Sequence, residues 1–386
     1  MTCTIYRPRL FTSIAATTLS LAACTSGNQT TYALPPPLTA RVRLTNLVEN
    51  TASTGVTSDD NLVDPWGVAL SSAGALWVAD NHTGVATVYD GTGATIPLTV
   101  TIPAPAGVAN VASPTGQVFN SVSTDFMGDM FILATQNGTI AGWQTGTTAT
   151  LRADRSASGA VYTGLDILDT AAGRVVSAAN FSNGTVDVFN TSYQAVSLPG
   201  SFIDPNPIAG FAPFNVLVAA DSVYVAYAKQ DAAMLGDVSG PGNGAINVFD
   251  DAGNFVRRLI TGGALNAPWG LAIAPADYPV IGGDLLVGNF GDGRVNAIDT
   301  LSGAMQALED AQGDPLSIPG LWALRFGDDQ ADESHLQIFF SAGPEGQLGG
   351  VLGRLDVADP TSSGSGGSGT SGGGGGTGGY GGGYGY

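Results

Sequence analysis

Charged and reactive side chains are scarce in this sequence of 386 residues. Only 12% of the residues are charged, lysine occurs once, as Lys229, and there are two histidines and two cysteines. These numbers are too small for a His-rich metal site or for a Cys-based one. The formal net charge of −19 disfavours nucleic acid and anionic lipid as partners. No stretch after the N-terminal segment is long and apolar enough to span a bilayer.

The N-terminal segment has the pattern of a secretion signal. Arg7 and Arg9 precede an apolar run that ends in the tetrapeptide L-A-A-C at Cys24. This tetrapeptide resembles the lipobox of bacterial lipoproteins, which implies that residues 1–23 are removed and that Cys24 carries a lipid. Thr25 follows the cysteine, and by the same resemblance this favours an outer-membrane lipoprotein in the periplasm or on the cell surface. The alternative is an ordinary secretory signal on a secreted protein.

Glycine and proline are abundant, with 56 and 21 residues, which suits a turn-dense β protein, and both ends of the chain have a biased composition. Residues 24–39 contain a run of three prolines and are interpreted as a spacer. Residues 359–386 consist mostly of Gly, Ser and Tyr, which cannot bury a core, so we expect a disordered tail. The folded domain is therefore predicted over residues 40–358.

One unit recurs six times within this domain. Its clearest copy is LWVADNHTGVATVYD, which begins at Leu76 and reads as two apolar strands on either side of a polar turn. The other copies, from clear to loose, are MFILATQNGTIAGWQ from Met130, VVSAANFSNGTVDVFN from Val175, LLVGNFGDGRVNAID from Leu285, VYVAYAK…GNGAINVFD from Val223 and LQIFFSAGPEGQLGGVLGRLDV from Leu336.

A second motif precedes several of these units. Pro65–Leu70 and Pro268–Ile273 both match P-W-G-[VL]-A-[LI], and looser versions begin at Pro213 and at Gly320. With a further short strand after each copy, every unit has four strands. A four-stranded antiparallel unit in six copies predicts an all-β fold, the six-bladed β-propeller, because one blade cannot bury both of its own faces.

The ring also has to close. The sixth unit lacks an outer strand, while residues 40–50 (ARVRLTNLVEN) form a strand-like segment that belongs to no unit. We predict that this N-terminal segment supplies the fourth strand of the sixth blade. Closure of this kind protects the strand edges in a chain that has no internal disulfide.

The repeats carry a family resemblance. LWVADNHTGVATVYD resembles NHL-type propeller repeats, in which an apolar strand ends in Val-Ala-Asp. The paired P-W-G motifs and the segment LLVGNFGDG make the chain similar to an uncharacterised family of secreted bacterial propeller proteins, some of which carry PEP-CTERM tails. The sequence departs from those members in its lipobox and its Gly/Tyr tail. The resemblance implies the fold and no activity.

Asp80, Asn81 and His82 stand side by side in the first unit, which raises the question of catalysis. The equivalent places in other units hold Asn180 and Asn289 but no histidine, as expected for side chains that hydrogen-bond their own turn. The alternative is a calcium site of Asp80, Asn180 and Asn289, since some gluconolactonase-like propellers hold a divalent cation on the axis. We expect no cofactor, with Ca²⁺ as that alternative.

Aromatic residues mark the first strand of most units. We assign Trp66, Phe119, Phe214, Trp269 and Trp322 to this place, whereas the third unit has Thr163. These side chains are expected near one mouth of the channel. They are either wedges packed between blades or an exposed rim that stacks on sugar rings or grips a partner.

The longest departure from the repeat is an insertion in the fourth unit, residues 229–244, which carries Lys229. Long loops on a rigid scaffold often bind partners.

No nucleophile or phosphate-binding motif is present. The preferred hypothesis is a non-catalytic, monomeric binding module for a protein or polysaccharide of the cell envelope or the extracellular space. It would use this loop and the aromatic rim, and it would touch the membrane only through a lipid anchor. The alternative is a metal-dependent hydrolase of lactonase type.

Overall fold

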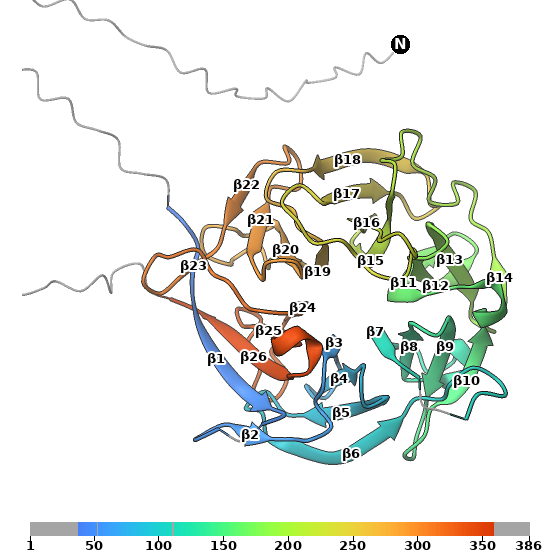
Figure 1. The fold of residues 1–386 in the computed structure, drawn as a ribbon, viewed down its shortest axis with the longest axis horizontal. Helices are drawn as coiled ribbons and strands as arrows, with labels where there is room; N and C mark the ends of the chain where they lie inside the picture. The colour runs from blue at the N-terminus through green and yellow to red at the C-terminus, as the bar shows by residue number, and fades with distance from the viewer. Residues whose placement is uncertain (1–37, 52, 110–111, 359–386) are drawn as a thin grey trace, which may run out of the picture. The chain divides into compact units, whose positions relative to one another are not determined.

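The computed structural model describes residues 38–51, 53–109 and 112–358. The predicted signal peptide, Cys24, nearly all of the spacer and the Gly-rich tail lie outside these ranges. In the described part the strands form six sheets around one axis, so the predicted six-bladed β-propeller is confirmed (Figure 1). No helix in the described ranges is long and apolar enough to cross a membrane.

Five blades are four-stranded antiparallel sheets in which the first strand is innermost and the fourth outermost. Their strands are β3 (Pro65–Leu70), β4 (Leu76–Asp80), β5 (Val85–Tyr89) and β6 (Thr95–Thr101); β7 (Pro114–Phe119), β8 (Phe131–Thr135), β9 (Thr139–Trp143) and β10 (Thr150–Asp154); β11 (Tyr162–Thr170), β12 (Gly173–Asn180), β13 (Thr185–Asn190) and β14 (Ala195–Val196); β15 (Phe211–Ala219), β16 (Ser222–Lys229), β17 (Gly244–Phe249) and β18 (Phe255–Thr261); and β19 (Pro268–Ile273), β20 (Leu285–Asn289), β21 (Val295–Ile298) and β22 (Met305–Ala307).

The sixth blade joins the two ends of the domain. It contains β24 (Leu321–Phe326), β25 (Ile338–Ala342), β26 (Val351–Val357) and the N-terminal strand β1 (Arg41–Glu49). β1 pairs with β26 in antiparallel register from Val42 opposite Val357 to Glu49 opposite Val351, which is the closure that the unmatched N-terminal segment predicted. Two short strands, β2 (Thr57–Ser58) and β23 (Glu309–Asp310), extend this sheet in parallel with β1. The short helical turns are η1 (Phe126–Gly128), η2 (Ser156–Ser158) and α1 (Pro344–Gln347).

The middle strands are buried on both faces because each blade is covered by two neighbours. Every residue of β4 is buried, whereas the outermost strand β6 is mostly exposed or half-buried. Trp77 of the first blade stacks on Phe131 of the second, with 4.0 Å between ring centroids. This environment explains why the middle strands are continuous apolar runs rather than alternating ones.

Glycine in the first-strand motif allows the innermost strands to approach one another. The third place of this motif holds Gly67, Gly116, Gly164 and Gly270 in four blades, and Asn215 and Ala323 in the other two. A Cβ atom on Gly67 would lie 2.6 Å from the carbonyl oxygen of Thr115 in the next blade. A Cβ atom on Gly270 would lie equally close, 2.6 Å, to the carbonyl oxygen of Trp322. The motif is therefore a requirement of ring packing.

Candidate functional site

Aromatic side chains meet on the axis at one end of the ring. Trp66, Phe214, Trp269 and Trp322, from four innermost strands, are all buried. Trp66 stacks on Trp322 with 3.6 Å between ring centroids, and Trp269 makes edge contacts with both, at 6.0 and 5.7 Å. Together with Phe181 and Phe290 these four residues are called the aromatic cluster here.

The indole N–H groups of the aromatic cluster all have buried acceptors. Trp66 Nε1 and Trp322 Nε1 donate to the two carboxylate oxygens of Asp64, at 2.8 and 2.9 Å. Trp269 Nε1 donates to the carbonyl oxygen of Thr163 at 2.8 Å. Burial raises the pKa of the Asp64 carboxyl, although the two indole donors and the nearby His82 act in the opposite direction. Asp64 thus links the tryptophans of two adjacent blades, Trp66 and Trp322, by hydrogen bonds.

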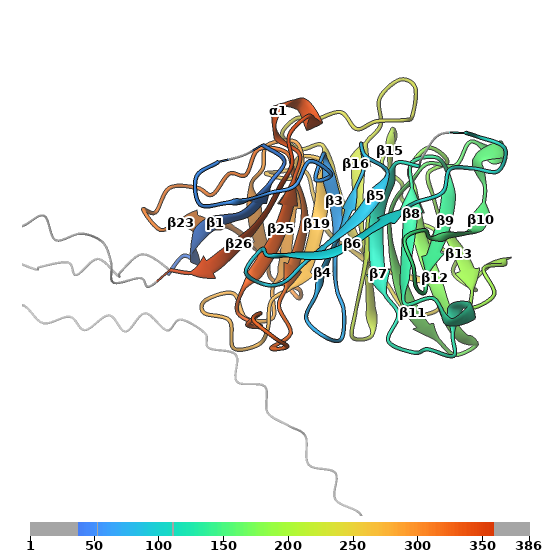
Figure 2. The same cartoon turned by 90° about the horizontal axis from the view of Figure 1, so that it is seen from below.

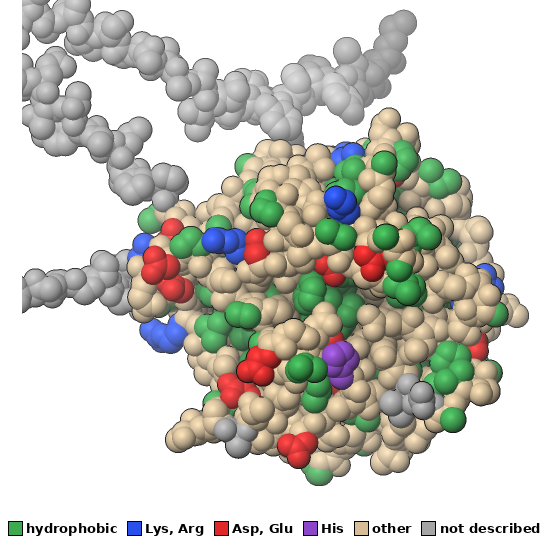
Figure 3. Space-filling view, viewed as in Figure 1, with side chains coloured by type: hydrophobic (Ala, Val, Ile, Leu, Met, Phe, Trp, Pro, Cys, Tyr) green, Lys and Arg blue, Asp and Glu red, His purple; other side chains and the backbone are tan. Residues whose placement is uncertain are grey.

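Of the two interpretations of these aromatic residues, the exposed rim is wrong for Trp66, Phe214, Trp269 and Trp322, because they pack against one another and leave almost no surface. The alternative of aromatic wedges between blades describes them better. Phe290, which lies outside the first-strand motif, is only partly buried and stacks on Trp322 with 4.0 Å between ring centroids. Hydrophobic side chains accordingly gather at the centre of the face shown in Figure 3.

The assignment of Phe119 to the aromatic position is also wrong. In β7 the residue after the leading proline is Thr115, whereas Phe119 ends the strand and packs against Phe131. Thr115 is buried, and its hydroxyl donates to the carbonyl oxygen of Tyr162 in the third blade at 2.9 Å. Two blades therefore have a threonine at this position, Thr115 and the predicted Thr163, and a hydrogen bond replaces ring packing at Thr115.

Asp80, Asn180 and Asn289 are buried at the ends of their second strands, and each is hydrogen-bonded within its own blade. Asp80 accepts from Thr87 Oγ1 at 2.8 Å, Asn180 Oδ1 from the Val161 N–H at 3.2 Å and Asn289 Oδ1 from the Asn266 N–H at 3.1 Å. No hydrogen bond joins two of the three. In the described ranges no group of three or more His, Cys, Asp and Glu side chains is arranged to hold a metal ion. Asn180 Oδ1 also accepts the N–H of the turn residue Asn183, and Asn289 Nδ2 donates to Asp292 in its turn, so the turn interpretation fits these two residues. Asp80 instead contacts the next strand, and its buried Oδ1 has no partner among the described residues.

The insertion loop, residues 229–244, lies at the same end of the ring as α1 (Figure 2). It is held at both ends by neighbouring blades. Gln230 Nε2 donates to the carbonyl oxygen of Phe181 in the third blade at 2.7 Å, and the Gly240 N–H donates to Asn266 Oδ1 beside the fifth blade at 2.6 Å. Inside the loop, Asp231 Oδ1 accepts the Leu235 N–H at 3.0 Å.

The tip of this loop is apolar and exposed. Its four consecutive residues Ala232, Ala233, Met234 and Leu235 are all exposed, with 51% of Met234 and 58% of Leu235 accessible. Lys229, which we predicted as a contact residue, is also exposed at the start of the loop.

Beyond the aromatic cluster the innermost strands of all six blades line a cavity of about 340 Å³, called the central channel here. Trp269 belongs to both the cluster and the channel wall. Gln117, Asp166 and Asn215 are among the polar residues that line this space. The Nε2 group of Gln117 donates to the carbonyl oxygens of Gly67 and Trp77, while its buried Oε1 has no partner among the described residues.

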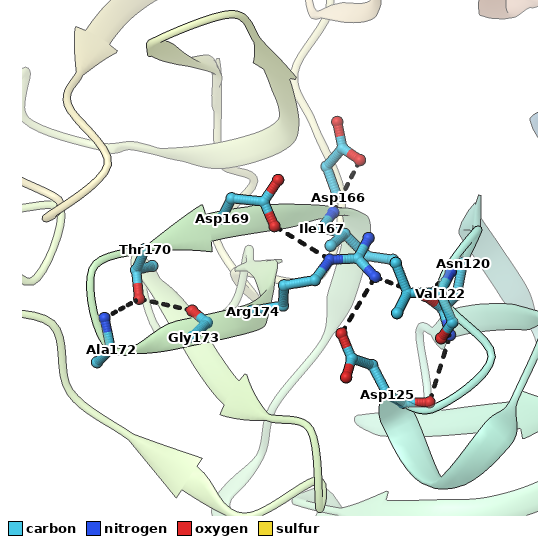
Figure 4. A network of polar contacts seen from close by, with 10 residues as sticks. All are labelled: Asn120, Val122, Asp125, Asp166, Ile167, Asp169, Thr170, Ala172, Gly173 and Arg174. Carbon is cyan, nitrogen blue, oxygen red and sulfur yellow. Dashed lines mark hydrogen bonds and ion pairs between the residues drawn. The ribbon is translucent and has the colours of Figure 1, made fainter.

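A polar network of the second and third blades lies beside the channel (Figure 4). Arg174 of β12 contacts Asp169 Oδ1 at 3.1 Å, Asn120 Oδ1 at 2.8 Å and Asp125 Oδ2 at 3.4 Å. Its charge is therefore compensated by two carboxylates. No sequence pattern indicated this network, since none of its residues lies in a repeated motif.

No protein-family model matches the chain. Among solved structures, a protein of unknown function from Bacteroides thetaiotaomicron superposes with a TM-score of 0.52 at 10% identity, covering 82% of this chain and 76% of that one, which shows the fold alone. Streptogramin B lyase gives a TM-score of 0.47 at 13% identity, covering 83% of this chain and 98% of that one.

The sequence relatives are viral. Uncharacterised protein R648 of Acanthamoeba polyphaga mimivirus is 29% identical over 330 residues, which are 81% of this chain and 80% of that protein. Uncharacterised protein L690 of the same virus is 31% identical over 340 residues, 83% of this chain and 87% of that protein. The resemblance to secreted bacterial proteins stays a prediction. By its identity and coverage, the chain belongs to the family of six-bladed propeller proteins that includes L690 of mimivirus.

Proposed function

We propose that this protein is a non-catalytic binding module that docks a protein partner on the tip of the insertion loop. The observation that carries the proposal is the exposed run of Ala232, Ala233, Met234 and Leu235 on a loop that two neighbouring blades hold in place. Single exposed apolar residues are ordinary, but four in succession on an ordered loop are a candidate contact surface.

Because the insertion loop is already ordered, binding a partner there costs less conformational entropy. Ordering a loop on association consumes part of the interaction energy, whereas here hydrogen bonds of Gln230, Asp231 and Asn266 already order it. Met234 is flexible and polarisable, which suits contact with another protein surface. The tip has no aromatic platform for sugar rings, so a protein is favoured over a polysaccharide.

The location of this module is part of the proposal. The L-A-A-C sequence at Cys24 supports a lipid anchor, and with it an envelope or extracellular partner, but Cys24 lies outside the described residues. No specific observation favours the lactonase-type hydrolase, which therefore enters the experiment only as an outcome.

The test compares the unaltered protein with the double variant Met234→Ser/Leu235→Ser and with the control Leu301→Ser. Leu301 is 84% exposed on the fifth blade, so the control removes a similar apolar surface elsewhere. Pull-downs from envelope extract, glycan arrays and a lactone panel are read in parallel. A protein that the control retains, and that the double variant binds at least about ten-fold more weakly, supports the proposal. Full retention by the double variant, glycan binding alone or lactone turnover contradicts it.

A further inference from the structure

The innermost strands share a register that can be followed from blade to blade. Two places after the close-packed third position, the six strands carry Ala69, Val118, Asp166, Leu217, Ala272 and Arg325. Four of these side chains are aliphatic, one is acidic and one is basic. Asp166, Arg325 and three of the aliphatic residues line the central channel.

The acidic and basic side chains come from opposite sides of the ring. Asp166 lies on β11 of the third blade and Arg325 on β24 of the sixth, and blades three places apart in a ring of six face each other across the axis (Figure 1). Because the two residues hold the same position of the motif, they lie at the same level of the channel.

Neither charge is neutralised by a direct ion pair. Both Asp166 oxygens accept backbone N–H groups, those of Ile167 and Val218, each at 2.8 Å. Arg325 is exposed and makes no hydrogen bond or ion pair with any described residue. Arg174, the other basic residue that lines the channel, is by contrast compensated by Asp169 and Asp125.

We propose that the central channel binds a small zwitterion, with its ammonium group on Asp166 and its carboxylate on Arg325. Guanidinium and carboxylate form strong charge-assisted hydrogen bonds, and Asp166, a half-buried carboxylate without a direct cation partner, is a favourable partner for an ammonium group. Ala69, Val118 and Leu217 would contact the aliphatic part between the two charges. A cavity of about 340 Å³ limits the ligand to a small molecule, such as an amino acid. This site is independent of the insertion loop.

The test is calorimetric titration of the full chain with ω-amino acids of two to six carbons. One member of the series should bind best, because its length matches the separation of the two charges. Alkylamines and alkanoates of the same length should bind at least about ten-fold more weakly, since each lacks one charge-assisted contact. Asp166→Asn and Arg325→Gln should each weaken binding of the preferred zwitterion by a similar factor.

Two charge-matched controls on the surface, Asp314→Asn and Arg43→Gln, should leave the affinity unchanged, since both side chains are exposed and neither lines the channel. Asp166 also holds two backbone N–H groups, so if Asp166→Asn fails to fold, the exposed Arg325→Gln decides. The proposal is overturned if no ω-amino acid binds, if the amine or the carboxylate alone binds as well as the zwitterion, or if Arg325→Gln binds like the unaltered protein.

Discussion

The ionisation of Asp166, a residue of the channel wall, makes the stability of the folded protein depend on pH. Its side chain lines the central channel, and burial raises the pKa of its carboxyl to about 6, although two backbone N–H groups and the charge of Arg325 act in the opposite direction. The folded protein therefore keeps this proton at pH values where the unfolded chain has lost it. Stability contributed by this group is present at low pH and is lost as the pH rises from about 4 to about 6.

Replacing Asp166 by Asn should remove this pH dependence. We expect the free energy of unfolding of Asp166→Asn, relative to that of the unaltered protein, to rise between about pH 4 and pH 6 and to stay constant above that range. Urea denaturation at a series of pH values measures this difference. Parallel stability curves across the whole range would mean that Asp166 titrates near its ordinary value.

At the scale of elements, an ion pair of the second blade is hydrogen-bonded to the third blade. Asp129 precedes β8 and is fully buried, Arg152 of β10 contacts both of its oxygens at 2.5 and 2.7 Å, and the hydroxyl of Tyr193 from the third blade donates to it at 2.6 Å. A Cβ atom on Gly142 would overlap the Asp129 carboxylate, which explains glycine inside β9. The interface between these blades is thus polar at one point and apolar around it.

Removing one partner of this pair should be costly. Asp129→Ala leaves the Arg152 side chain, which is only 13% exposed, without its counter-charge, and it also removes the acceptor of the Tyr193 hydroxyl, so the free energy of unfolding should fall by about 3 kcal/mol. The comparison is Asp356→Ala, which breaks the partly exposed pair with Arg354 and should cost less than about 1 kcal/mol. Denaturant titration gives both values, and equal losses would contradict the special role of the Asp129 pair.

At the scale of the molecule, the ring depends on a strand from the far end of the chain. β1 completes the sixth blade by pairing with β26, and Arg41 Nε contacts Glu309 Oε2 of β23 at 3.1 Å. Val42 and Val48 of β1 are completely buried. Without β1, the ring would have an open strand edge and would lose the burial of these valines, about 1.5–3 kcal/mol for each.

Deleting residues 40–50 should therefore lower the melting temperature far more than deleting residues 361–386, or prevent folding altogether. Thermal unfolding of the two truncated proteins beside the full chain makes the comparison. Equal melting temperatures for both truncations would show that ring closure by β1 contributes little.

Much of the architecture could be predicted because its causes are local. A buried strand, a Gly- and Asn-rich turn and a second strand can be recognised within fifteen residues, as in the segment from Leu76 to Asp90. Counting such units predicts the number of blades, and the unmatched segment before the first unit predicts the closing strand. Comparing the units also predicted side chains that serve their own turn, and at the place of Asp80 the side chains of Asn180 and Asn289 contact such turns in two other units.

The sequence by itself determined the fold class, the number of blades and the way in which the ring closes, because these depend on repeats and on edges that must be paired. Only the tertiary structure decided that Trp66, Trp269 and Trp322 are buried on the axis rather than exposed at a rim. It also decided that Asp166 and Arg325 share one level of the channel. The reason is physical: which side chains converge on the axis depends on the register and tilt of strands from different blades, and contacts between distant segments set both.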